Sequence, residues 1–95
     1  MIGGLTDTKP SDKDVQQIVE AIKTKFEELN YNTDKFEPIS YKTQVVNGVN
    51  YFVKLETDKE YVHLRIHQAL AHNDSLITLH SYQSNKHIEE DIIYF

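Results

Sequence analysis

The chain contains no cysteine, and no run of apolar residues long enough to cross a membrane. Without cysteine there is no disulfide, no zinc–thiolate site and no cysteine nucleophile, and a reducing compartment is compatible. A membrane span needs about 18 consecutive apolar residues, and the first ten residues lack the basic and apolar regions of a secretory signal. We therefore expect a cytoplasmic protein with no membrane partner.

Basic charge is also scarce. Lysine and arginine number 10 against 15 aspartates and glutamates, which gives a formal net charge of -5. Binding to nucleic acid needs clustered basic side chains that neutralise phosphates, so we expect no nucleic-acid partner. The 95 residues are 39% hydrophobic and 26% charged, an ordinary globular composition. This length predicts one small domain over residues 1–95, with a single core.

One segment carries a helical pattern of apolar residues. They recur at steps of three and four, which places them on one face of a helix: Val15, Ile18, Val19, Ile22, Phe26 and Leu29. Ser11, with Asp14 three residues later, resembles a capping box, so the helix is predicted to begin there. The preceding residues 1–10 are short of any periodic pattern and are interpreted as a mobile arm.

The rest of the chain alternates between apolar and polar residues, as strands do. Four such runs are predicted, within residues 39–45, 49–55, 62–66 and 76–82. Asn47 and Gly48 join the first two runs and favour a two-residue type I′ turn. The apolar tail, residues 88–95, is expected to pack back onto the body. Together these elements predict an α+β fold, with an antiparallel sheet curled around one helix.

Metal binding and catalysis find little support in the polar residues. His63 and His67 alternate with apolar residues on a strand, which predicts a solvated sheet face and puts them about 13 Å apart, too far to share an ion. Pairing across to His80 would depend on the strand register. The acidic run at residues 89–91 diverges on an extended tail and has no nucleophile beside it. We expect no metal, no cofactor and no enzymatic activity.

A family resemblance enters at residues 44–48. Their sequence, "QVVNG", resembles the Gln-Val-Val-Ala-Gly signature of the cystatins, and the surrounding "YKTQVVNGVNYFVKL" is similar to the disulfide-free stefin, or type 1 cystatin, branch. Further similar segments span the whole chain: "MIGGL", "KPSDKDVQQIV", "YVHLRI", "LAHN", "YQSNK" and the final "YF". The resemblance implies the cystatin fold, an antiparallel sheet wrapped around one long helix, in which a short N-terminal strand makes a fifth.

The resemblance also implies a function. Cystatins are reversible, tight-binding competitive inhibitors of papain-like cysteine proteases such as the cathepsins, and they insert an N-terminal arm and two hairpin loops into the active-site cleft. The matching positions here are Met1, Ile2, Gly3 and Gly4 in the arm, Gln44, Val45, Val46, Asn47 and Gly48 in the first loop, and Leu70, Ala71, His72 and Asn73 in the second. Valines at the first tip would leave water on binding, at about 25 cal/mol per Å².

Two departures from the family pattern leave an alternative open. Asn47 replaces the usual Ala, and Leu70 is followed by Ala71 where a Leu-Pro pair is common. The alternative is a non-inhibitory binding or scaffold module that keeps the cystatin fold but has redirected loop specificity. Family members can also exchange the helix and first strands between two chains, with residues 44–48 as the hinge. An unstrained Asn-Gly turn resists this, so a monomer is expected, and a domain-swapped dimer is the alternative.

Overall fold

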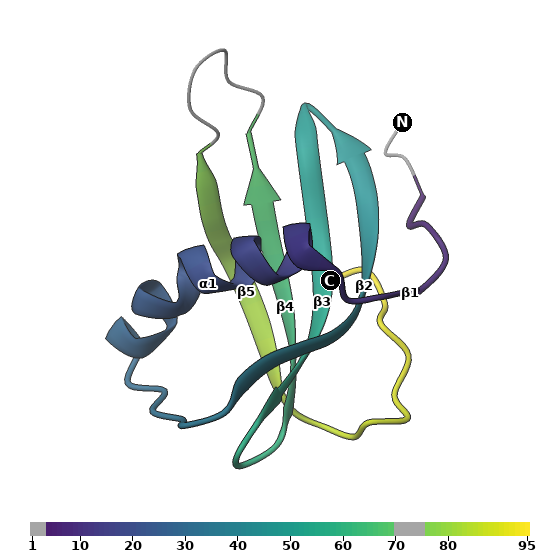
Figure 1. Ribbon diagram of the computed structural model, residues 1–95. Coiled ribbons are helices and arrows are strands. Elements are labelled where there is room, and N and C mark those ends of the chain that lie inside the picture. Colours follow the sequence, from purple (N-terminus) through teal and green to yellow (C-terminus); the bar gives the residue numbers. More distant parts are fainter. Residues whose placement is uncertain (1–3, 70–75) are drawn as a thin grey trace.

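The computed structural model describes residues 4–69 and 76–95. Its elements are β1 (Lys9–Pro10), α1 (Lys13–Glu28), β2 (Phe36–Val46), β3 (Gly48–Thr57), β4 (Tyr61–Gln68) and β5 (Ile77–Lys86). The strands form one antiparallel sheet in the order β1-β2-β3-β4-β5, and α1 lies across one face of it (Figure 1). The predicted α+β architecture, including the short N-terminal strand, is confirmed.

The apolar stripe of α1 forms half of the core. Five of the six predicted positions are buried: Val15, Ile18, Val19, Ile22 and Phe26. Leu29, the sixth, is the C-cap residue and is exposed. The N-cap is Asp12 rather than the predicted Ser11, because the Asp12 carboxylate accepts a hydrogen bond from the Val15 amide at 2.9 Å and another from the Tyr41 hydroxyl at 2.8 Å. One carboxylate thereby ties the start of the helix to β2.

The other half of the core is the face of the sheet that meets α1. Cross-strand pairs place Val53 opposite Leu64 and Leu55 opposite Val62, and all four are fully buried against the helical stripe. Their alternation along β3 and β4 is the period of two that the sequence predicted. The middle of the inner face is therefore an apolar layer, and the alternate positions of these strands point to the outer face.

The outer face is not the solvated surface that the sequence suggested. Residues 87–95, the yellow tail in Figure 1, return to this face, and Ile92 within the tail is buried. The Phe52 ring lies 5.7 Å from the rings of both Tyr94 and Phe95. The predicted return of the apolar tail onto the body is confirmed, and the prediction of a solvated face is wrong because local alternation does not reveal a cover that comes from a distant segment.

His63 is the clearest consequence of this cover. It is 0% exposed, and neither ring nitrogen has a hydrogen-bond partner. Burial lowers the pKa of the imidazole to about 4, and the positive charges of Lys54 and Lys86 act in the same direction. His63 is therefore a neutral ring within the protein at physiological pH.

Candidate functional site: the tip of the β2–β3 hairpin

The hairpin between β2 and β3 turns at a single residue. Val45 pairs with Val49 and Val46 pairs with Gly48, so Asn47 alone lies between the last paired residues. A two-residue Asn-Gly turn would instead have paired Val46 with Val49. Gly48 has a positive φ of 109°, whereas Asn47 does not, and a type I′ turn requires both. The predicted hairpin is present, but the predicted turn type is wrong.

Position 48 requires glycine because the tip packs on the end of β4. A Cβ atom added to Gly48 would lie 2.4 Å from the main-chain oxygen of Gln68 and 3.2 Å from the α-carbon of Ala69. Main chain cannot yield as a flexible side chain can, so any larger residue would push β3 and β4 apart. Gly48 therefore makes a close main-chain contact within the protein itself.

The tip exposes apolar side chains. Val45 is 72% exposed and Val46 is 37% exposed, and the intervening turn residue, Asn47, is also exposed. Gln44 differs from its neighbours because its side chain is only 2% exposed and points to the outer face of the sheet. Of the described positions in the predicted first loop, the two valines and Asn47 are thus available to a partner, whereas Gln44 and Gly48 are buried.

The N-terminal segment lies along the edge of β2. The Thr6 amide donates to the Thr43 carbonyl at 2.9 Å, and the Thr43 amide donates to the Thr6 hydroxyl oxygen at 3.0 Å. Residues 6–10 are therefore held against the sheet, and the prediction that they belong to a mobile arm is wrong. Gly4 is exposed, with open space where a side chain would be. Met1, Ile2 and Gly3 lie outside the described residues.

The end of β4 and the start of β5 complete this end of the molecule. The Ala69 amide donates to the Leu76 carbonyl at 2.9 Å, and Leu76 is exposed. The predicted second-loop residues Leu70, Ala71, His72 and Asn73 lie outside the described residues. Because Ala69 is also a neighbour of Gly48, the stem between β4 and β5 lies beside the β2–β3 tip (Figure 1). Three segments from distant parts of the sequence thus meet at one end of the sheet.

A chain of polar side chains runs beneath the tip on the outer face. Asn50 donates its amide hydrogen to the Gln44 side-chain oxygen at 3.0 Å, and its own side-chain oxygen lies 2.8 Å from Nδ1 of His67. Asn50 is 5% exposed. Neither Asn50 nor His67 was among the predicted site residues. Only the strand register could have indicated them, because it places each directly opposite its partner.

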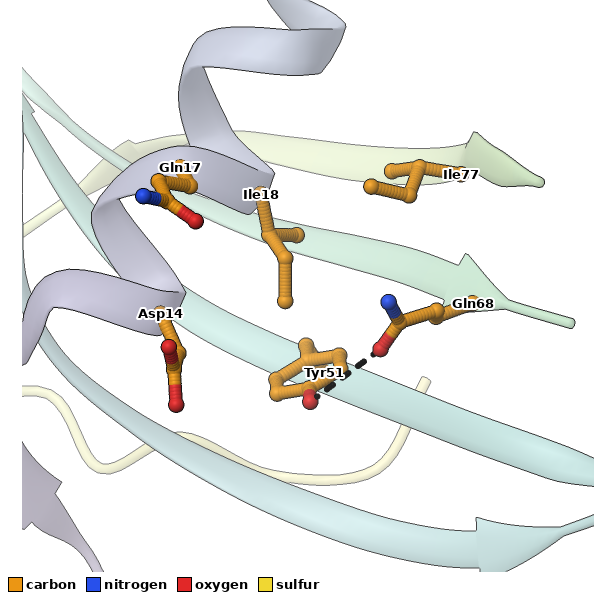
Figure 2. Close-up of a pocket in the computed structure, with 6 residues that line it drawn as sticks. All are labelled: Asp14, Gln17, Ile18, Tyr51, Gln68 and Ile77. Atoms are coloured by element: carbon orange, nitrogen blue, oxygen red, sulfur yellow. Dashed lines mark hydrogen bonds between the residues drawn. The ribbon is translucent and has the colours of Figure 1, made fainter. Parts of the chain in front are cut away.

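A cavity of about 280 Å³ opens on the other side of the sheet, between α1 and the strand ends (Figure 2). Its lining mixes polar and apolar side chains: Asp14, Gln17, Ile18, Tyr51, Gln68 and Ile77. The Tyr51 hydroxyl makes a long hydrogen bond of 3.4 Å to the Gln68 side-chain oxygen. Burial, and then the negative charges of Asp14 and Asp12, raise the pKa of Tyr51. A lone carboxylate in this lining provides no acid–base pair.

Neither a metal-binding cluster nor a membrane-spanning helix is present among the described residues. Within residues 4–69 and 76–95, no group of three or more histidine, aspartate or glutamate side chains could hold a metal ion. His63 and His67 lie opposite Gln83 and Thr78 of β5, so the register does not bring either against His80. In the same part of the chain, no helix is long and apolar enough to cross a membrane.

Known proteins with similar sequences agree with this architecture. Residues 3–89 match the model of the cystatin domain. The chain is 38% identical to cystatin-B of Pan troglodytes, with 100% of this chain and 99% of that protein covered, and 39% identical to cystatin-A of Felis catus, with 98% and 97% covered. It is also 33% identical to stefin-C of Bos taurus, with 99% and 95% covered. The chain therefore belongs to the stefin branch of the cystatin family, whose members inhibit cysteine proteases and are not enzymes.

Proposed function

We propose that this protein is a reversible, tight-binding competitive inhibitor of papain-like, cathepsin-type cysteine proteases, and that the β2–β3 tip is the centre of its contact surface. The observation that carries the proposal is the exposure of Val45, 72%, at the end of a hairpin. Moving a valine side chain from water into a protease cleft contributes roughly 1.5–3 kcal/mol. An apolar tip that is unfavourable in the free protein becomes favourable in the complex.

Rigidity of the tip supports the same proposal. Association loses affinity when loops must be ordered on binding. Here the contact of Gly48 with the end of β4 and the pairing of Val46 with Gly48 hold the loop in one shape before any partner arrives. The tip therefore docks with a small entropic cost.

The same pairing explains how an inhibitor avoids becoming a substrate. A papain-like protease cleaves a segment that it holds in an extended form. The chain on both sides of Asn47 is engaged in the β2–β3 ladder up to the last pair, so extending it would break those hydrogen bonds. We infer that the tip covers the catalytic residues without presenting a bond for cleavage.

The remaining parts of the wedge follow from family membership and from their place beside the tip. We propose that Met1, Ile2, Gly3 and Gly4 enter the nonprimed pockets and that Leu70, Ala71, His72 and Asn73 contact the primed side. Gln44 would act indirectly, because its side chain is buried.

We further propose that the active form is a monomer, because exposure of Val45 depends on the closed hairpin within one chain. The unstrained type I′ turn no longer supports this proposal, since that turn is not formed. A cytoplasmic location agrees with the lack of cysteine. Gel filtration tests the oligomeric state, and an inactive dimer as the main species would contradict the proposal.

The test is a titration of the purified protein against papain with a fluorogenic peptide substrate. We expect reversible, stoichiometric loss of activity that excess substrate competes away. The double variant Gly4→Ala, Val46→Asp should lose inhibition while its thermal unfolding stays unchanged, because Gly4 has open space around it and Val46 is on the surface. Wild-type protein without effect at micromolar concentration would refute the proposal and favour a non-inhibitory binding module.

A further inference from the structure

The outer face beneath the tip contains a row of three hydrogen-bonded polar side chains, of which two are buried and the third, His67, is half-buried. Gln44, Asn50 and His67 are directly opposed across β2, β3 and β4, and the first two are 2% and 5% exposed. Apolar side chains at these positions would also fill the space. The choice of hydrogen-bonding groups therefore needs a reason other than burial.

The direction of the hydrogen bonds shows how the row is ordered. The Asn50 amide group donates to Gln44 at 3.0 Å, which leaves its oxygen to accept from His67 at 2.8 Å. An amide oxygen only accepts, so Nδ1 of His67 carries the proton in this contact. Asn50 thus uses both ends of one side chain to link the strand before the tip to the strand on which the tip rests.

The row also touches the tip itself. The Cε1 atom of His67 is 3.1 Å from the position of a Cβ atom added to Gly48, so the imidazole lies directly against that glycine. Apolar packing has no fixed direction, whereas a buried and satisfied hydrogen-bond row permits one arrangement. The row therefore connects β2, β3 and β4 directly beside Gly48.

We propose that Asn50 is a positioning residue for inhibition, which acts through Gln44 and His67 to hold the exposed valines at the angle that a protease cleft accepts. This inference rests on the proposed function and deepens it. Neither Asn50 nor His67 needs to touch the protease, because their contribution is the shape of the tip in the free protein.

The test replaces Asn50 by leucine, which has a similar branched shape and no hydrogen-bonding group. We expect the Asn50→Leu variant to bind papain at least about tenfold more weakly, since the tip is no longer held. Amide hydrogen exchange of residues 46–48 should accelerate in the free variant, while exchange in the middle of β4 changes no more than global stability requires. A purely structural role would alter both regions together.

Two control variants separate this role from a general loss of stability. Tyr51→Phe removes the long hydrogen bond on the opposite face at the neighbouring position, and should change inhibition less than twofold. Val62→Ala opens a cavity in the core opposite Leu55, away from the tip, and should lower stability without changing inhibition while the protein remains folded.

The possible outcomes are distinguishable. Wild-type protein that fails to inhibit papain refutes the proposed function. Equal inhibition by wild type and by Asn50→Leu refutes only the positioning role, and so does an equally weakened Val62→Ala variant, because the effect would then follow stability. Selective loss in Asn50→Leu, with faster exchange confined to residues 46–48, is the result that supports it.

Discussion

Strand β3 begins at one hairpin turn and ends at another, and the two turns are built in opposite ways. At its start, Val45 and Val46 are exposed around Asn47. At its end, the Thr57 hydroxyl oxygen accepts hydrogen bonds from the amides of Lys59 and Glu60 at 3.2 and 3.1 Å. A turn that only reverses the chain satisfies its polar groups with its own side chains. The exposed valines of the β2–β3 tip make no such internal contact, which agrees with the proposal that the tip is a contact surface.

The variant Gly48→Ala should have the largest effect, because it changes both the stability of the β2–β3 tip and its function. The added methyl group would collide with the main chain of Gln68, and the alanine backbone would be held at a strained φ. Each of these effects costs about 1–3 kcal/mol. We expect a loss of about 3 kcal/mol in the free energy of unfolding, measured by urea titration, and a large loss of papain inhibition. Gly4→Ala is the matched control, and a comparable loss of stability there would contradict the explanation.

The variant Val45→Asp should remove function and spare the fold. Because Val45 is exposed in the free protein, stability should change by less than about 0.5 kcal/mol. In the complex the substitution would bury an unpaired charge, so the inhibition constant should rise at least about 100-fold. Lys59→Asp makes a charge change at the other turn, and should leave inhibition unaltered. Tight inhibition by Val45→Asp would show that the tip is not the contact surface.

Acid should weaken the half of the sheet near the polar turn. The pKa of His63 is about 4 in the folded protein, below its ordinary value of 6.5, so the unfolded chain takes up the proton first. The free energy of unfolding is therefore unaffected by this group above pH 6.5. It falls by about 2–3 kcal/mol as the pH is lowered from 6.5 toward 4. Urea titrations of wild type and His63→Phe between pH 7 and 4 test this. Parallel curves for the two proteins would exclude His63 as the source.

The smallest effect is expected at the polar turn. Thr57→Val keeps the shape of the side chain but removes the hydroxyl that serves Lys59 and Glu60, and it should cost about 1 kcal/mol of stability. Inhibition of papain should stay the same, because this turn lies at the opposite end of β3. Thr57→Val should thus lower stability and spare inhibition, whereas Val45→Asp should do the opposite. A change in the inhibition constant of Thr57→Val would contradict the distinction between the two turns.

The sequence predicted those features that depend on local spacing. The helical stripe, the alternating strands and the hairpin at Asn47 and Gly48 follow from periodicity and turn chemistry. The turn type did not, because Asn-Gly can serve turns of different length and contact with Gln68 decides between them. The helix start shifted by one residue because Ser11 and Asp12 can both cap, and only Asp12 also bonds Tyr41.

The residues of the candidate site show the same distinction between what local sequence reveals and what depends on distant contacts. The valines of the tip were identified through the resemblance of residues 44–48 to the cystatin signature, and their exposure agrees with that prediction. Asn50 and His67 could not be identified, since each is bound to its partner across a strand register that no single segment contains. The buried state of His63 was hidden for a similar reason, because its cover comes from the far end of the sequence.

The contact between Gly48 and the Gln68 main chain has a consequence for how relatives should be compared. A glycine inside a binding loop would be kept through evolution even if no partner ever touched it, because the loop cannot close without it. Invariance at such a position records a demand of folding, whereas variation at Val45 or Asn47 would record a change of target. Within one short loop, the residue that varies least would then say least about specificity.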